Sequence, residues 1–141
     1  MATIQPMTRL CVYCAFLLLA ACGPSGPPEP FHGTWTVTST LAPQVSAIAQ
    51  GAVITLEPGR ARSGDRTCGG ATYTRRSLSV ETFTEAYRIT PQQLSLSGDP
   101  VALVDVMCES GGLEVGSTLV LVSDTKMLTM WEGVFYVLTR S

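Results

Sequence analysis

Five cysteines and one histidine carry the most versatile side chains of this 141-residue sequence. Thiols can hold a metal ion, form a disulfide, act as nucleophiles or carry a lipid, and their spacing helps to separate these roles. Cys11 and Cys14 have the C-x-x-C spacing of redox and metal motifs, whereas Cys22, Cys68 and Cys108 each stand alone. Which role applies depends on the compartment in which the chain folds, because disulfides persist only in oxidising ones.

Acid–base chemistry would need two ionisable groups, or a nucleophile and a base, within reach of one another. The candidates are His32, Asp65, Arg66, Glu81, Glu85 and Asp105. Like charges four residues apart, as at Glu81 and Glu85, normally mark a solvated helix face. Asp105 interrupts the apolar run VALVDVM, where it either faces solvent, the preferred interpretation, or has a raised pKa in a pocket. The sequence therefore predicts a protein that is not an enzyme and holds no metal or cofactor.

The N-terminal residues predict the compartment. Arg9 precedes an apolar run over residues 10–21, which is typical of a secretory signal and shorter than the about 20 residues that span a membrane. The run ends in Leu19-Ala20-Ala21-Cys22, which resembles the lipobox of bacterial lipoproteins. That resemblance implies cleavage before Cys22 and acylation of the cysteine, and several acyl chains give a stable anchor. The alternative is ordinary cleavage, which leaves a secreted protein with a free Cys22.

The same resemblance divides the chain into three parts. Residues 1–21 are expected to be a signal peptide, residues 22–30 a lipidated cysteine with a Pro/Gly-rich tether, and residues 31–141 one folded domain. In such lipoproteins a glycine after the cysteine, here Gly23, favours the outer membrane, with the domain on its periplasmic or surface side. The tether sequence GPSGPPEP favours extended polyproline II structure.

The cysteines can then be assigned. Cys11 and Cys14 leave with the signal and Cys22 carries lipid, so Cys68 and Cys108 are expected to form a disulfide in an oxidising periplasm. Two free thiols that bind a metal are the alternative. The formal net charge of −2 and the absence of any Lys/Arg-rich run argue against a nucleic-acid partner.

Short alternating stretches separated by turn residues dominate residues 31–141. Strands are predicted over residues 34–40, 52–57, 71–77, 101–108, 117–123, 126–131 and 134–140, with a polar loop at 60–70. A short helix is predicted at 42–50, a helix or irregular segment over 78–90 that enters a strand near Tyr87, and an alternating stretch at 94–96. In the strand at 101–108 the even positions are the better core candidates. This pattern predicts a mainly β fold, a single small antiparallel β-barrel with one or two short helical segments, because closure removes exposed edges.

Gly33-Thr34-Trp35 in the first strand and a last strand that ends in Arg140 resemble small bacterial lipocalin-like barrels. That resemblance implies that Trp35 packs under the basic side chain of Arg140 and closes one end of the barrel. A weaker similarity is to the META-type lipoprotein domain, on the residues around Cys68, Tyr73 and Cys108.

Aromatic residues are the best candidates for binding. Trp35, Tyr73, Trp131 and Tyr136 line either a filled core or the mouth of a ligand-accepting barrel. The sequence thus predicts a membrane-anchored, non-catalytic binding module of unknown ligand, with a small apolar molecule or an envelope protein as the candidate partner. The alternatives are an inhibitor or interaction lipoprotein that contacts an envelope or host protein, and a purely structural envelope protein.

Overall fold

The computed structural model describes residues 28–41 and 50–141. The predicted signal, the lipobox with Cys22, most of the tether and the predicted helix at 42–50 lie outside the described residues. The strands are β1 (Gly33–Thr40), β2 (Val53–Glu57), β3 (Gly59–Ser63), β4 (Arg66–Leu78), β5 (Val101–Met107), β6 (Ser110–Gly111), β7 (Thr118–Ser123), β8 (Lys126–Trp131) and β9 (Val134–Arg140). The helices are α1 (Val80–Tyr87) and a 3-10 turn, η1 (Pro91–Leu94).

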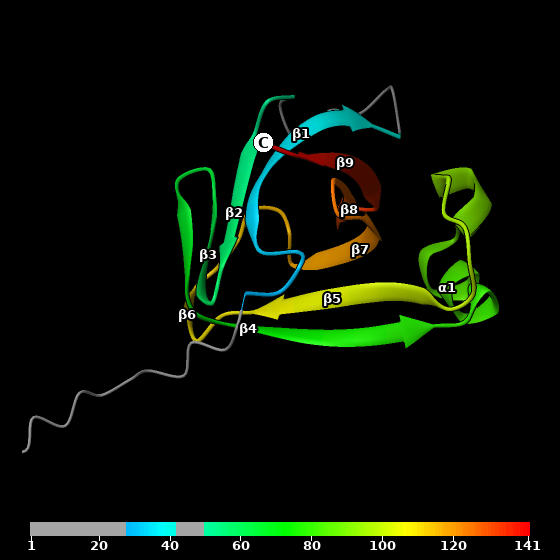
Figure 1. Cartoon of the computed structure of the whole chain (residues 1–141), viewed down its shortest axis with the longest axis horizontal. Coiled ribbons are helices and arrows are strands. Elements are labelled where there is room, and N and C mark those ends of the chain that lie inside the picture. The colour runs from blue at the N-terminus through cyan, green and yellow to red at the C-terminus, as the bar shows by residue number, and fades with distance from the viewer. Residues whose placement is uncertain (1–27, 42–49) are drawn as a thin grey trace, which may run out of the picture.

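Eight of these strands form a closed antiparallel barrel, as predicted (Figure 1). Neighbours in the barrel follow one another along the chain, except that the first strand, β1, pairs with the last, β9. The order is β3-β2-β1-β9-β8-β7-β5-β4, and β3 also pairs with β4, so the ring is closed. This up-and-down arrangement is the one that lipocalins use. The two-residue β6 lies outside the ring and pairs with β4.

The polar segment at residues 60–70 is not a loop, and that prediction was wrong. It forms β3 and the first part of β4, a hairpin in which Ala61 pairs with Cys68 and Arg62 with Thr67. Ala61 and Ser63 are buried, whereas Arg60 and Arg62 are exposed. Small side chains on the inner face fit the narrow interior of a small barrel, and their low hydrophobicity concealed the alternation.

The segment between β4 and β5 contains both helical elements, α1 and η1. Ser79 caps α1 by accepting a hydrogen bond from the Thr82 amide, and the helix ends at Arg88, whose φ is 58°. Thr90 and Gln93 form a capping box around η1. No strand forms near Tyr87, and Leu94 lies in η1 rather than in an alternating stretch, because caps and Pro91 favour helical turns here.

The barrel wall is apolar on both faces along part of its circumference. The interior cluster contains Trp35, Ile54, Leu119 and Leu138, among others. A second cluster lies outside the wall, where Phe83 of α1 and Leu94 of η1 cover outward side chains of β5, β7, β8 and β9. Burying a phenylalanine such as Phe83 contributes about 2–3 kcal/mol. The helical segment thus packs on one side of the barrel.

Strand β5 belongs to both clusters. Its even residues Val104 and Val106 face the interior, as predicted, while Val101 and Leu103 are also buried, in the outer cluster under the helices. The outer face of β5 is therefore mixed, because Asp105 and the exposed Met107 lie on it beside the buried Val101 and Leu103.

Cys68 and Cys108 form the predicted disulfide, with Cα atoms 5.1 Å apart. The bond ties β4 to the segment that follows β5, and the adjacent β6 pairs Gly111 with Cys68. Gly111 has a φ of 72°, and a Cβ atom there would overlap the Thr67 carbonyl oxygen. Only glycine therefore lets this segment approach β4 so closely.

Candidate functional site

Trp35 and Arg140 close one end of the barrel. Trp35 is fully buried, and the Arg140 Cζ atom lies 4.3 Å from the centroid of its ring system. The indole Nε1 donates a hydrogen bond to the Phe31 carbonyl oxygen at 2.9 Å. A guanidinium over an indole face is attracted by the ring quadrupole. The predicted contact between Trp35 and Arg140 is confirmed.

Arg140 also joins two segments that are distant in sequence. Its Nε donates to the Asp124 carbonyl oxygen at 2.7 Å, in the turn between β7 and β8, and its Nη1 donates to the His32 carbonyl oxygen at 3.0 Å. Its Nη2 donates to the carbonyl oxygen of Pro30. The planar fork of arginine suits this arrangement, which the single ammonium of a lysine would not reproduce.

Residues 28–32, here called the crossing segment, lead into β1 at this end of the barrel. Phe31 is 3% exposed, and its ring centroid lies 5.2 Å from that of Tyr73. The Tyr73 hydroxyl donates to the carbonyl oxygens of Glu57 and Arg60, at 2.9 and 3.0 Å. Burial raises the pKa of Tyr73 to about 12. Tyr73 therefore stays protonated and holds the crossing segment against the β2–β3 turn.

His32 forms the next contact of the crossing segment. The Glu29 amide donates to its Nδ1 at 2.8 Å, so a neutral ring carries its proton on Nε2. The Nε2 atom is buried without a hydrogen-bond partner among the described residues. Burial lowers the pKa of His32, and the nearby Glu29 carboxylate opposes this effect more weakly. The neutral imidazole is therefore the form that fits this site.

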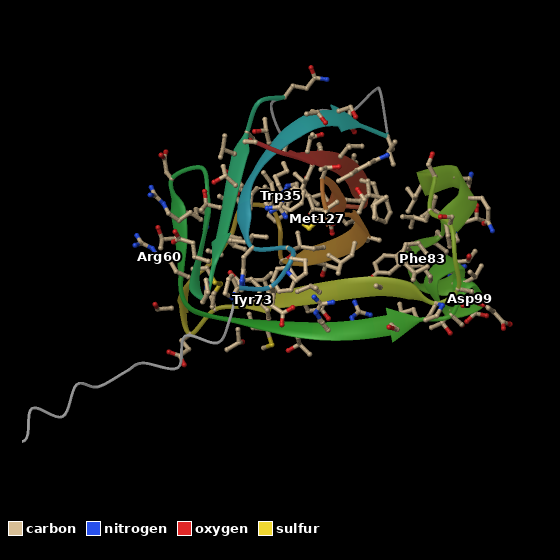
Figure 2. All side chains as sticks on the ribbon, in the orientation of Figure 1. Trp35, Arg60, Tyr73, Phe83, Asp99 and Met127 are labelled. Atoms are coloured by element: carbon tan, nitrogen blue, oxygen red, sulfur yellow. A yellow bond between two sulfur atoms is a disulfide. The ribbon has the colours of Figure 1, made fainter. Side chains whose placement is uncertain are left out.

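A pocket of about 250 Å³ opens beside Trp35 and the crossing segment. Its apolar lining includes Phe31, Trp35, Leu121 and Met127, and Arg75 and Asp124 supply its charged side chains. Figure 2 shows Trp35 and Met127 together inside the ring of strands, with Phe83 outside it. An apolar cavity of about 150 Å³ accepts benzene, and drug-sized sites begin near 300 Å³. The pocket thus has room for a compact molecule.

Arg75 lies at this pocket with its guanidinium partly in solvent. Its Nη2 lies 2.7 Å from Oε2 of Glu29, and the two side chains are 50% and 46% exposed. The Arg75 Cζ atom is also 5.4 Å from the centroid of the Phe31 ring. The crossing segment thus brings the Glu29 carboxylate into an ion pair with Arg75, the cation in the pocket lining.

The opposite end of the barrel is covered by residues 108–117. Val115 is 2% exposed, and its amide donates to the Ser63 hydroxyl at 3.3 Å. The disulfide holds the start of this segment. Tyr136 is buried in the interior cluster. Trp131 is half-buried and packs against the same cluster. Side chains from both ends of the barrel thus belong to one buried interior cluster, and the pocket lies beside Trp35 at one end.

Asp105 points to the outer face of the barrel and is not free in solvent. Its carboxylate accepts from Nε of Arg76 at 2.5 Å and from the Thr118 hydroxyl at 3.1 Å. The hydrogen bond from Arg76 lowers the pKa of Asp105. Arg76 also donates to the Tyr87 hydroxyl, so the Asp105–Arg76 pair attaches α1 to the barrel wall. These contacts give Asp105 a structural role.

The other acid–base candidates remain apart. Glu81 and Glu85 are exposed on α1, and Asp65 and Arg66 are exposed at the β3–β4 hairpin. Among the described residues, no group of three or more His, Cys, Asp or Glu side chains lies close enough to hold a metal ion. Within the same ranges, no helix is long and apolar enough to cross a bilayer.

Of the four predicted ligand-binding aromatics, the structure places Trp35 in the pocket and Tyr73 behind the crossing segment. Trp131 and Tyr136 do not contribute to the pocket lining. Sequence reasoning missed Arg75 and Glu29. The signal that was present is the Arg75-Arg76 pair in a strand, because neighbouring strand residues point to opposite faces and one of the two cations must turn inward.

The chain was compared with protein families, curated proteins and solved structures. No protein-family model, no curated protein and no solved structure matches this chain.

Proposed function

We propose that the protein is a lipid-anchored, non-catalytic binding protein of the bacterial envelope, which takes a small ligand at the Trp35 end of its barrel. The observation that carries this proposal is the pocket of about 250 Å³ over Trp35 and Met127. Buried side chains such as Leu119 and Tyr136 occupy the interior, which favours a ligand at the barrel end over one at the barrel centre.

Three ionisable groups support binding over catalysis, because their hydrogen bonds are structural. Asp105 accepts from Arg76 and Thr118, His32 accepts from the Glu29 amide, and the Tyr73 hydroxyl donates to two carbonyl oxygens. A general base or nucleophile has to be free to exchange a proton with a substrate. His32 and Tyr73 instead hold the crossing segment beside the pocket, and Asp105 helps to hold α1 on the outer wall.

Methionine methyl groups provide a direct binding test. Protein from cells that express the full chain is labelled with 13C at the methionine methyl carbons, and 3-phenylpropan-1-ol is titrated into it. Binding is expected to shift the Met127 resonance and to leave that of Met107, which is 66% exposed and far from the pocket lining, unchanged. Leu121→Trp should fill the pocket and abolish the shift. Equal shifts at both methionines, or none with this alcohol and with its carboxylate analogue, would refute the proposed binding site.

The anchor needs its own test, which rests on the Leu19-Ala20-Ala21-Cys22 resemblance. Cys22→Ala should move the protein from the membrane fraction to the soluble fraction, and Cys11→Ala should not. Unchanged fractionation of the Cys22 variant would refute lipidation.

A further inference from the structure

We propose that the ligand is a small amphipathic carboxylate, that Arg75 binds its carboxylate, and that Glu29 occupies Arg75 until the ligand replaces it. This inference rests on the proposed function, since it names the class of molecule that the same pocket takes. It is carried by the contact between Arg75 and Glu29 at a pocket that is lined mainly by apolar side chains.

Glu29 shows what kind of group Arg75 accepts at this position. The pair meets through Nη2 of Arg75 and Oε2 of Glu29, 2.7 Å apart, so this contact uses one nitrogen of the guanidinium fork. A ligand carboxylate in the pocket can form two parallel hydrogen bonds with such a fork. Exposed ion pairs contribute little to stability, and both side chains here are about half exposed. Glu29 is therefore a displaceable partner.

The rest of the lining selects an apolar body. Trp35 and Met127 are buried, and Phe31 and Leu121 complete the apolar surface. By comparison with the cavity that accepts benzene, the volume of about 250 Å³ suits roughly ten non-hydrogen atoms. A carboxylate attached to a phenyl or short branched alkyl group meets both requirements.

The other charged group of the lining limits the ligand to a single negative charge. Asp124 is exposed in the turn after β7, and its carbonyl oxygen is already bound by Arg140. A phosphate or dicarboxylate would bring a second negative charge towards this acid, and like charges at short range repel. A monocarboxylate satisfies Arg75 without that cost.

Two matched probes test the inference in the full-length protein. The carboxylate 3-phenylpropanoate and the alcohol 3-phenylpropan-1-ol have the same apolar body, and the affinity of each is read from the Met127 methyl shift. We expect the carboxylate to bind about ten-fold more tightly, as for a hydrogen bond to a charged group. Arg75→Gln should reduce the affinity for the carboxylate to that for the alcohol, while Arg62→Gln, an exposed arginine of β3, should change neither.

Glu29→Gln gives the sharper result. Removing the competing carboxylate should tighten binding of 3-phenylpropanoate by roughly two- to five-fold, as expected for an exposed ion pair, and leave the alcohol unchanged. Glu85→Gln on α1 is the control. If both probes bind equally and Glu29→Gln has no effect, the carboxylate inference is wrong while the binding site stands. If neither probe shifts Met127, the proposed function fails as well. Met130 of β8 packs against the outer cluster and is not in the pocket lining, so an unchanged Met130 methyl resonance shows that a variant is folded.

Discussion

The guanidinium of Arg140 stacks on the indole of Trp35 at 4.3 Å and donates hydrogen bonds to three backbone carbonyls, those of Pro30, His32 and Asp124. These contacts join the first and last strands to the crossing segment and to the β7–β8 turn. The Arg140 side chain thus ties together the chain segments at the end of the barrel where the pocket lies.

Replacing Arg140 should destabilise the domain. Arg140→Ala removes the cation–π contact and leaves carbonyl groups without a protein donor, for a loss of about 2–3 kcal/mol in the free energy of unfolding. Arg140→Lys should recover only part of it, because an ammonium lacks the fork. Urea unfolding measures both variants, with Arg62→Ala as the control. Equal stability of the lysine variant and the unaltered protein would contradict the role of the fork.

Gly33 is expected to resist substitution for two separate reasons. Its φ is 137°, and a Cβ atom there would lie 2.6 Å from Nη1 of Arg140. Gly98 has a φ of 110° with nothing within 4 Å, so Gly98→Ala measures backbone strain alone. Gly33→Ala should cost about 1–3 kcal/mol more than Gly98→Ala, the usual range for overpacking. Thermal unfolding compares them, and equal losses would show that Arg140 moves aside without cost.

His32 should make stability depend on pH in a window of its own. Its pKa is lowered in the folded state, so the unfolded chain binds the proton more tightly. The contribution of neutral His32 to the free energy of unfolding is therefore complete above the pKa that His32 has in the unfolded chain, near 6.5. It is lost as the pH falls towards the lower pKa that His32 has in the folded protein.

The chain has one histidine, so His32→Gln should flatten the dependence of unfolding free energy on pH just below 6.5. The carboxylate of Asp105, whose pKa is lowered from 3.8, should produce a second loss at lower pH that this variant retains. Urea unfolding at a series of pH values measures both. A stability that rises on acidification through 6.5 would contradict the sign.

Loss of the Cys68–Cys108 disulfide should lower the free energy of unfolding of the domain. The cysteines are 40 residues apart, and a loop of that length corresponds to up to about 4 kcal/mol in the chain-entropy model. Cys108→Ala with Cys68→Ala should lower the midpoint of urea unfolding accordingly. Thiol labelling of the unreduced, denatured protein checks the bond itself, and labelling at either cysteine would contradict it.

Local patterns in the sequence predicted much of the wall. In β1 the alternation of Trp35 and Val37 with threonines indicated which face is buried, and the turns around β7, β8 and β9 indicated a meander. The pairing of Cys68 with Cys108 followed from the predicted compartment. Lipidation of Cys22 stays a prediction, since that residue lies outside the described ranges.

Strand β3 and the cover of β5 could not be predicted in this way. Ala61 and Ser63 are too small to mark an inner face, and they are buried because Ala61 joins the interior cluster and the segment around Val115 covers Ser63. Leu103 is buried because α1 and η1 fold back over the outer wall. Both outcomes depend on contacts between residues distant along the chain.

By itself, the sequence determined the strand alternation, the turns and the residues available for a disulfide, because each depends on residue type and local spacing. The Trp35–Arg140 pair was expected only from the resemblance to lipocalin-like barrels, since it joins the first and last strands. Tertiary structure alone decided which end of the barrel is hollowed and which charges meet there. Glu29 and Arg75 are 46 residues apart, and only the path of residues 28–32 across the barrel end brings that carboxylate onto that cation.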